Sequence, residues 1–300
     1  ECKHWYLKVF KPSCLHSFHS EGVFIMNSEN NLVIGKSEYS HQINGSDTVC
    51  RKDLGKYSKI TFVSNPNKTV SIRKLNKNEY VDLRTGEIKQ YNLDKPTSKG
   101  DVNRKLKRYE EIVIFNFTGG ASELFLTLTC RENITDISVI KQYYNNFLDN
   151  IKSDYQHLEY VALFEQTENM CWHIHLFLKN NNHKKLHIPH FNLLQYWGQG
   201  AVYVMQNKNT FQTLGHSKDK RDDRLERFTH FPKGEKMYHR SKGIQTPTKE
   251  ILTFMDCPEF NSDNHTKVSS KTYQVRNKTN DKIVNTIVTE MYKQTKTDKV

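Results

Sequence analysis

The chain has 300 residues, of which 26% are charged, and its formal net charge at neutral pH is +12. That length allows one large domain or two smaller ones, each with its own core. No run of about 18 or more apolar residues occurs and no signal-peptide pattern is present, so we expect a cytoplasmic protein that does not bind membranes. The positive charge favours an anionic partner, with nucleic acid as the first candidate and simple solubility as the alternative.

The cysteines are scattered along the chain. None of the six forms a CxxC pair, so the spacing of a zinc ribbon is absent. We therefore expect free thiols in a reducing compartment.

Residues 1–110 mix short β-like runs with many Asn, Ser and Lys residues. Runs at 22–26, 59–63 and 70–73 predict hairpins of an N-terminal β-rich accessory region, whose role the sequence does not indicate. Residues 95–100 have the composition of a linker. The basic stretch 104–108 that follows predicts an amphipathic helix, with either a solvated face or a phosphate-contacting one.

From residue 124 the pattern becomes regular. It predicts a strand at 124–129, a helix at about 137–152, strands at 158–165 and 172–178, a short helix at 191–197 and a strand at 201–205. The helix follows from apolar residues that recur every three or four positions, with Thr135 and Asp136 available as caps. This order predicts an α+β fold, an antiparallel β-sheet flanked by helices.

Two histidines separated by one apolar residue interrupt the strand at 172–178. Because side chains alternate along a strand, His173 and His175 project from one face while Trp172 and Ile174 point into a core. Glu165 ends the preceding strand, and antiparallel pairing would bring its carboxylate beside both imidazoles. Hydrogen-bonded histidines without a ligand role are the alternative. The break in an otherwise hydrophobic strand favours a site with two histidines and one carboxylate for a divalent metal.

These residues resemble the HUH endonucleases, in which U is a hydrophobic residue. More narrowly, the chain is similar to rolling-circle replication initiators of plasmids and integrative elements from Gram-positive bacteria. The resemblance covers about residues 80 to 250. Besides HIH at 173–175 it is carried by TGEI at 85–88, the helical segment 103–111, NFTGG at 116–120, ELFLTLT at 123–129, REN at 131–133, YWGQG at 196–200 and YHRSKGI at 238–244.

The resemblance implies cleavage of one DNA strand by transesterification. In that family a divalent metal, commonly Mn²⁺ or Mg²⁺, polarises the scissile phosphate, and a tyrosine attacks and stays joined to the 5′ phosphate. By ligand type the site also fits Zn²⁺. DNA, single-stranded or in an origin hairpin, is the expected partner, and a host helicase is a further candidate.

The expected nucleophile is missing from its usual place. Similar initiators carry a tyrosine on a helix soon after the strand that follows YWGQG, whereas this chain has Phe211 in that segment. Tyr203, in the strand at 201–205, and Tyr238, before a basic group, are the candidate substitutes. A packing role is the alternative for Tyr203. A lost nucleophile or attack by water would leave a DNA-binding protein or a simple hydrolase.

Basic residues near the motifs are candidates for DNA contacts. The best set lies around Gly234 and Gly243, and the resemblance adds an arginine after the first strand; together they are Arg131, Lys233, Lys236, His239, Arg240 and Lys242. Residues 218–227 alternate in charge, which predicts an exposed helix that is either solvated or in contact with DNA.

We expect three parts: the N-terminal accessory region at 1–110, the HUH endonuclease domain at 111–250, and a C-terminal tail at 251–300 with a hairpin around residues 277–280. A non-catalytic origin- or single-strand-binding protein that keeps the HUH fold is the main alternative function. A metal-dependent oxygenase with the same ligand set fits the basic charge less well.

Overall fold

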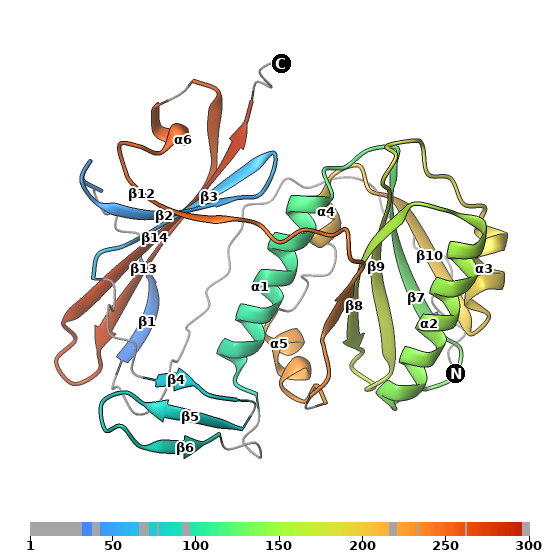
Figure 1. The fold of residues 1–300 in the computed structure, drawn as a ribbon, viewed down its shortest axis with the longest axis horizontal. Helices are drawn as coiled ribbons and strands as arrows, with labels where there is room; N and C mark the ends of the chain where they lie inside the picture. The colour runs from blue at the N-terminus through green and yellow to red at the C-terminus, as the bar shows by residue number, and fades with distance from the viewer. Residues whose placement is uncertain are drawn as a thin grey trace.

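The computed structural model describes residues 32–37, 43–65, 72–76, 78–91, 97–215, 221–232, 234–261 and 263–295. Their strands form three antiparallel sheets of six, five and three strands, and helices cover the five-stranded sheet (Figure 1). The α+β class with antiparallel sheets flanked by helices is confirmed.

The five-stranded sheet has the order β10-β7-β9-β8-β11, so the histidine strand is central. The predicted strands at 124–129, 158–165, 172–178 and 201–205 are all confirmed, each extended by one or two residues at one or both ends. The sheet consists of β7 (Glu123–Cys130), β8 (Leu158–Gln166), β9 (Trp172–Asn180), β10 (Gly200–Gln206) and β11 (Tyr238–Arg240).

Helices α2 (Ile137–Asp154) and α3 (His190–Trp197) cover one face of this sheet (Figure 1). The side chain of Asp136 accepts a hydrogen bond from the Ser138 backbone N–H and caps α2, as predicted. The apolar positions of α2 are buried, and the Tyr144 ring packs edge-on against Phe164 of β8. Trp172 and Ile174 are almost fully buried, which confirms that they point into a core.

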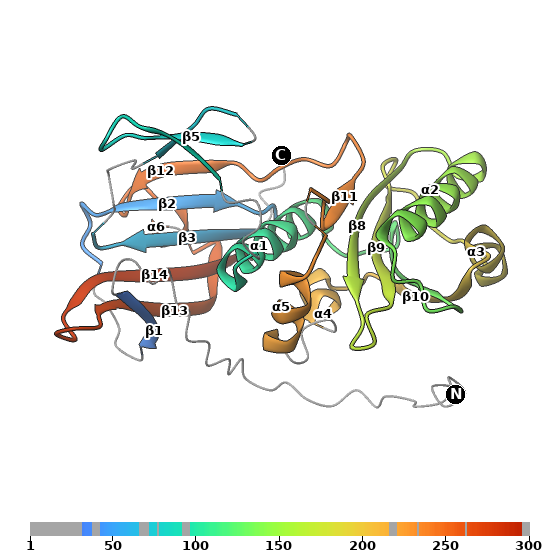
Figure 2. The ribbon, with the colours of Figure 1, turned by 90° about the horizontal axis from the view of Figure 1, so that it is seen from below.

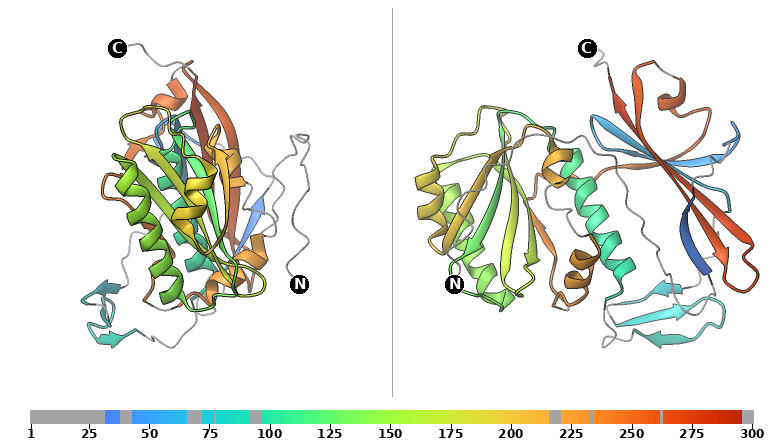
Figure 3. Two further views of the ribbon diagram at one scale, coloured as in Figure 1. Left: turned by 90° about the vertical axis from the view of Figure 1, so that its right-hand side faces the viewer. Right: turned by 180° about the vertical axis from the view of Figure 1, so that it is seen from behind.

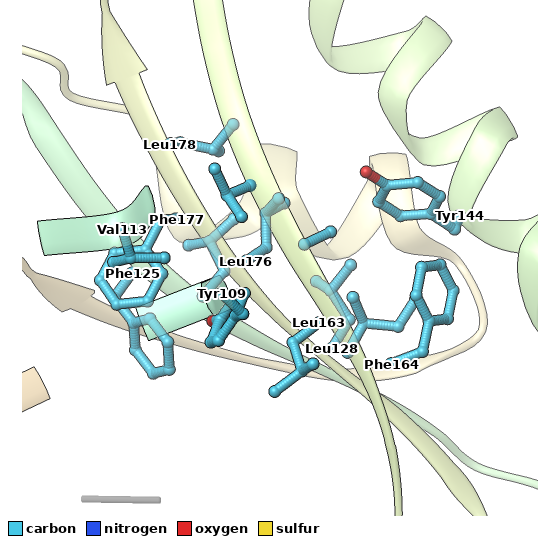
Figure 4. Close-up of a cluster of buried hydrophobic side chains, with 14 of the residues drawn as sticks. Tyr109, Val113, Phe125, Leu128, Tyr144, Leu163, Phe164, Leu176, Phe177 and Leu178 are labelled. Atoms are coloured by element: carbon cyan, nitrogen blue, oxygen red, sulfur yellow. The ribbon is translucent and has the colours of Figure 1, made fainter. Parts of the chain in front are cut away.

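Helices α1 (Lys99–Asn116), α4 (Thr210–Gly215) and α5 (Arg221–Thr229) lie on the opposite side. Figure 4 shows Tyr109 and Val113 of α1 with Phe177 on one side of the strands, and Tyr144 and Phe164 on the other. The predicted linker at 95–100 is wrong at its C-terminal end. Helix α1 begins at Lys99, because the Ser98 side chain accepts from the Asp101 N–H and caps it.

The six-stranded sheet combines segments from both ends of the chain. Its order is β1-β13-β14-β3-β2-β12. Its elements are β1 (Leu32–Ser37), β2 (Thr48–Asp53), β3 (Tyr57–Val63), β12 (Lys249–Thr253), β13 (His265–Asn277) and β14 (Ile283–Gln294), with α6 (Pro258–Asn261) alongside. A separate small core of Val49, Ile60, Phe62, Val288, Tyr292 and Cys257 stabilises it.

The pairing of β14 with β3 was not predicted, although β13 and β14 form the long C-terminal hairpin expected around residues 277–280. The division at residues 110 and 250 stays a prediction. The run expected at 22–26 lies outside the described residues.

A small sheet of β4 (Ile72–Lys74), β5 (Glu79–Asp82) and β6 (Ile88–Gln90) lies at the periphery (Figure 2). Helix α1 stands between the two large sheets in Figures 1 and 2 and in the right-hand view of Figure 3. Glu111 of α1 accepts from Lys52 and Lys59 of the six-stranded sheet at 2.7 and 2.8 Å. Among the helices of the described residues, none is long and apolar enough to cross a membrane.

Candidate metal centre

The register of β8 and β9 brings the predicted triad together. Glu165 lies directly opposite His173, and His175 follows two residues later on the same face. The two imidazole Nε2 atoms are 3.0 Å apart, and Glu165 Oε2 lies 3.6 Å from His175 Nε2. One ligand atom from each residue falls within 4.8 Å of the others, so the three side chains can together hold a metal ion.

Thr127 of β7 fixes the orientation of His175. Its Oγ1 lies 3.2 Å from His175 Nδ1 and is hydrogen-bonded to it, and the Phe125 ring stacks on the same imidazole. With Nδ1 engaged, Nε2 is the atom left to bind an ion. A hydrogen bond of this kind orients a histidine ligand towards the ion.

The protonation states suit a metal. Burial lowers the pKa of His173, and burial together with the neighbouring His173 lowers the pKa of His175 to about 3. Burial would raise the pKa of Glu165, but the charge of Arg224 and its hydrogen bonds outweigh this and lower it. At neutral pH the imidazoles are therefore neutral and the carboxylate is ionised, the forms that bind metal ions.

The donor set fits a divalent ion with open positions. Two imidazole nitrogens and one carboxylate leave room for water or a phosphate oxygen. This ligand set is compatible with Mn²⁺, Mg²⁺ or Zn²⁺, so the choice of Mn²⁺ or Mg²⁺ stays a prediction.

Two arginines of α5 hold Glu165, a feature that sequence reasoning missed. Arg224 Nε donates to both carboxylate oxygens at 2.9 and 3.0 Å, and its Nη2 donates to Oε2 at 2.7 Å. Arg227 donates from Nε to the Gln166 carbonyl, and its Nη2 lies 3.5 Å from Glu165 Oε1.

The prediction that residues 218–227 form an exposed helix is therefore wrong for Arg224, which is only 7% exposed. Residues 216–220 lie outside the described part of the chain. The available signal was the apolar pair Leu225 and Phe228, three residues apart and both buried, which marks a buried side of α5.

In the described part of the chain, the sheet face that carries the histidines has exposed residues on β7 and β10. Directly opposed residues share a face, and here Tyr203, Thr127 and His175 form one row across β10, β7 and β9. Tyr203 is 60% exposed, so it is not a core packing residue. Thr129 and Ala201, on the same face, are also exposed.

Tyr238 ends the same row on the other side. It pairs with Leu163, which in turn lies opposite His175. Its ring is partly buried and packs 5.6 Å from that of Tyr109. Tyr109 itself is buried, and burial raises its pKa, with Arg224 and Glu165 among the charges that act on it.

Phe211 lies on α4, where the resemblance expects a tyrosine. It is partly buried, and its ring packs edge-on against Tyr57 of β3 at 4.4 Å. No hydroxyl is available at this position.

The predicted DNA contacts do not form one patch. Arg131 is exposed after β7, the second strand of the sheet, whereas Lys236, Arg240 and Lys242 are exposed around the edge strand β11. The His239 ring packs against Phe164 and Tyr144 on the α2 side, and its Nε2 is buried without a hydrogen-bond partner among the described residues. Lys233 lies outside the described residues.

The family comparison covers the core of this sheet. Residues 123–222 match a family model described as replication-associated protein ORF2. The match supports a role in replication initiation. It includes β7, β8, β9 and β10, and with them the whole triad. No curated protein and no solved structure matches the chain.

Proposed function

We propose that the protein is a replication initiator of the HUH type that nicks one DNA strand at an origin and later rejoins the ends. The observation that carries this proposal is the convergence of Glu165, His173 and His175 within 4.8 Å, inside the segment that matches a replication-associated family. The net charge of +12 suits a DNA substrate.

Tyr203 is the nucleophile we favour. It shares a row across the sheet with Thr127 and His175, and its side chain is exposed. Its backbone lies two strands, or roughly 10 Å, from the backbone of His175. A phosphodiester lying over Thr127 would therefore meet both the phenol and the histidines. Tyr238 is less suitable, because Leu163 separates it from His175 and its ring is packed on Tyr109.

The reaction follows from these positions. An ion held by the triad would supply Lewis-acid stabilisation of charge on the phosphoryl oxygens. The Tyr203 oxygen bonds to phosphorus, and its proton passes to solvent. The bond from phosphorus to the 3′ oxygen breaks, and that oxygen takes up a proton from solvent, which leaves a free 3′-hydroxyl and a 5′-phosphotyrosine link. Attack by a 3′-hydroxyl reverses these steps and rejoins the strand.

A non-catalytic origin- or single-strand-binding protein is the second candidate. Phe211 favours it, because this residue packs against Tyr57 where an attacking tyrosine is expected. On this alternative the triad binds metal, and DNA binds, but no bond is broken.

An assay with labelled single-stranded DNA from the protein's own element distinguishes the two candidate functions. With Mn²⁺ we expect a covalent adduct that runs as a shifted band on a denaturing gel and is lost with chelator or in His173→Ala. Tyr203→Phe should abolish the adduct. Tyr196→Phe removes a hydroxyl that donates to Asp154, away from the triad, and this variant should still form the adduct. Cleavage without an adduct would indicate hydrolysis by water, and binding without cleavage would favour the second candidate.

A further inference from the structure

The carboxylate of the triad is already occupied by a protein cation. Arg224 makes three hydrogen bonds of 2.7 to 3.0 Å to the two oxygens of Glu165, and both side chains are at most 8% exposed. A metal ion that needs a Glu165 oxygen must therefore compete with a bidentate guanidinium.

The charges around the triad also disfavour a free dication. Among the described residues, Glu165 pairs with Arg224 at 2.7 Å and with Arg227 at 3.5 Å, and its carboxylate lies 3.6 Å from His175. The described side chains of this centre thus carry one negative and two positive charges. Adding a dication to a largely buried, positive site is unfavourable unless an anion enters with it.

Arg224 can bind a phosphate in place of the Glu165 carboxylate. The guanidinium fork binds carboxylate and phosphate oxygens with the same bidentate geometry. If Arg224 turns to a phosphodiester, the Glu165 oxygens become free for the ion, and the phosphate adds the missing negative charge.

We propose that Arg224 is a positioning residue that makes metal binding depend on nucleic-acid phosphate: it holds Glu165 when DNA is absent and exchanges it for the phosphate when DNA binds. This inference rests on the proposed function, because it assigns the phosphate to the DNA backbone. Linkage makes the effect reciprocal, so metal also strengthens DNA binding by the same factor.

Calorimetric titration with Mn²⁺, with and without an oligothymidylate of six nucleotides, tests the proposal. We expect the oligonucleotide to tighten Mn²⁺ binding by about tenfold or more, within the range usual for coupled sites. His173→Ala should remove Mn²⁺ binding in both conditions, which assigns the heat to the triad.

The Arg224→Gln variant should bind Mn²⁺ about tenfold more tightly than wild type without oligonucleotide, and the oligonucleotide effect should shrink to about threefold or less. Arg224→Lys keeps the charge and should stay closer to wild type. Arg276→Gln removes a partly exposed arginine that pairs with Asp281 in the β13–β14 hairpin, and should change neither quantity.

An oligonucleotide that leaves the Mn²⁺ affinity of the wild type unchanged would overturn the proposal, and this result needs no variant to fold. So would an Arg224→Gln variant with the coupling intact. The two proposals fail separately. Coupling without a covalent adduct would reject the nicking activity alone, and an adduct without coupling would reject the role of Arg224 alone.

Discussion

Thr127 has a larger role in the metal centre than its size suggests. Its hydroxyl engages His175 Nδ1, so the imidazole presents Nε2 to the same point as His173. It also lies directly between His175 and Tyr203 in the row across the sheet. One residue therefore both orients a ligand and separates that ligand from the candidate nucleophile by a single strand.

Thr127→Val keeps the shape but removes the hydroxyl. We expect Mn²⁺ affinity to fall about tenfold, because partners of metal-bound histidines typically contribute that much or more. Calorimetry gives the affinity directly. Thr129→Val, at the next position on the same face, should bind Mn²⁺ as wild type does, and a similar loss in both variants would count against a specific role for Thr127.

His239 predicts a pH dependence of folding. Burial, aided by Lys141 and Lys236, lowers its pKa, and no described residue forms a hydrogen bond with its Nε2. The folded state thus keeps it neutral where the unfolded chain, with a pKa of about 6.5, takes up a proton. The unfolded state binds more protons, so the free energy of unfolding falls as the pH drops below about 6.5 towards the folded pKa.

Urea unfolding from pH 7.5 to 5.5 measures this slope. In His239→Gln the loss of stability on acidification should be smaller than in wild type. His187→Gln, at an exposed histidine, should retain the wild-type slope. Equal slopes in all three proteins would show that His239 does not carry the effect.

At the scale of elements, local patterns were sufficient for the central sheet and insufficient for α5. The spacing of Ile140, Tyr144, Phe147 and Ile151 predicts α2, and the alternation around His173 predicts which face of β9 is buried. Helix α5 reads as solvated because its charges alternate. Its buried Arg224 is explained by Glu165, 59 residues earlier, and no local pattern contains that partner.

The cap of α2 gives a prediction at this scale. Asp136→Ala removes the acceptor for the Ser138 N–H, which is 2.7 Å from Oδ1. We expect a loss of about 1 kcal/mol in the free energy of unfolding. Asn146→Ala, at an exposed position in the middle of α2, should be neutral or slightly stabilising. Chemical denaturation of both variants measures these changes. An unchanged free energy of unfolding in Asp136→Ala would contradict the role of the cap.

At the scale of the whole molecule, the six-stranded sheet shows where sequence reasoning stops. The strands at 57–63 and 283–294 each have a legible pattern, but their pairing depends on register between segments more than 200 residues apart. The triad was predictable because its residues lie within eleven positions on two adjacent strands. The charges around the triad were not predictable, because they come from the arginines of α5, which lies elsewhere in the chain.

Glu111 connects the two large sheets through α1. Its carboxylate, mostly buried, accepts from both Lys52 and Lys59. Glu111→Gln should lower the free energy of unfolding by about 1–3 kcal/mol, because two partly buried lysines lose their counter-charge. Glu87→Gln, the exposed partner of Lys89, should change it by less than about 0.5 kcal/mol. Equal effects from the two substitutions would argue against a structural role for Glu111.

The central claim is that the open row from His175 to Tyr203 is where DNA is cut. The most direct measurement is peptide mapping, by mass spectrometry, of the adduct formed with Mn²⁺ and single-stranded DNA. We predict that the nucleotide is attached to Tyr203. Attachment to Tyr238 or to another tyrosine would contradict the assignment of the nucleophile, and the absence of any adduct while metal and DNA both bind would contradict covalent cleavage itself.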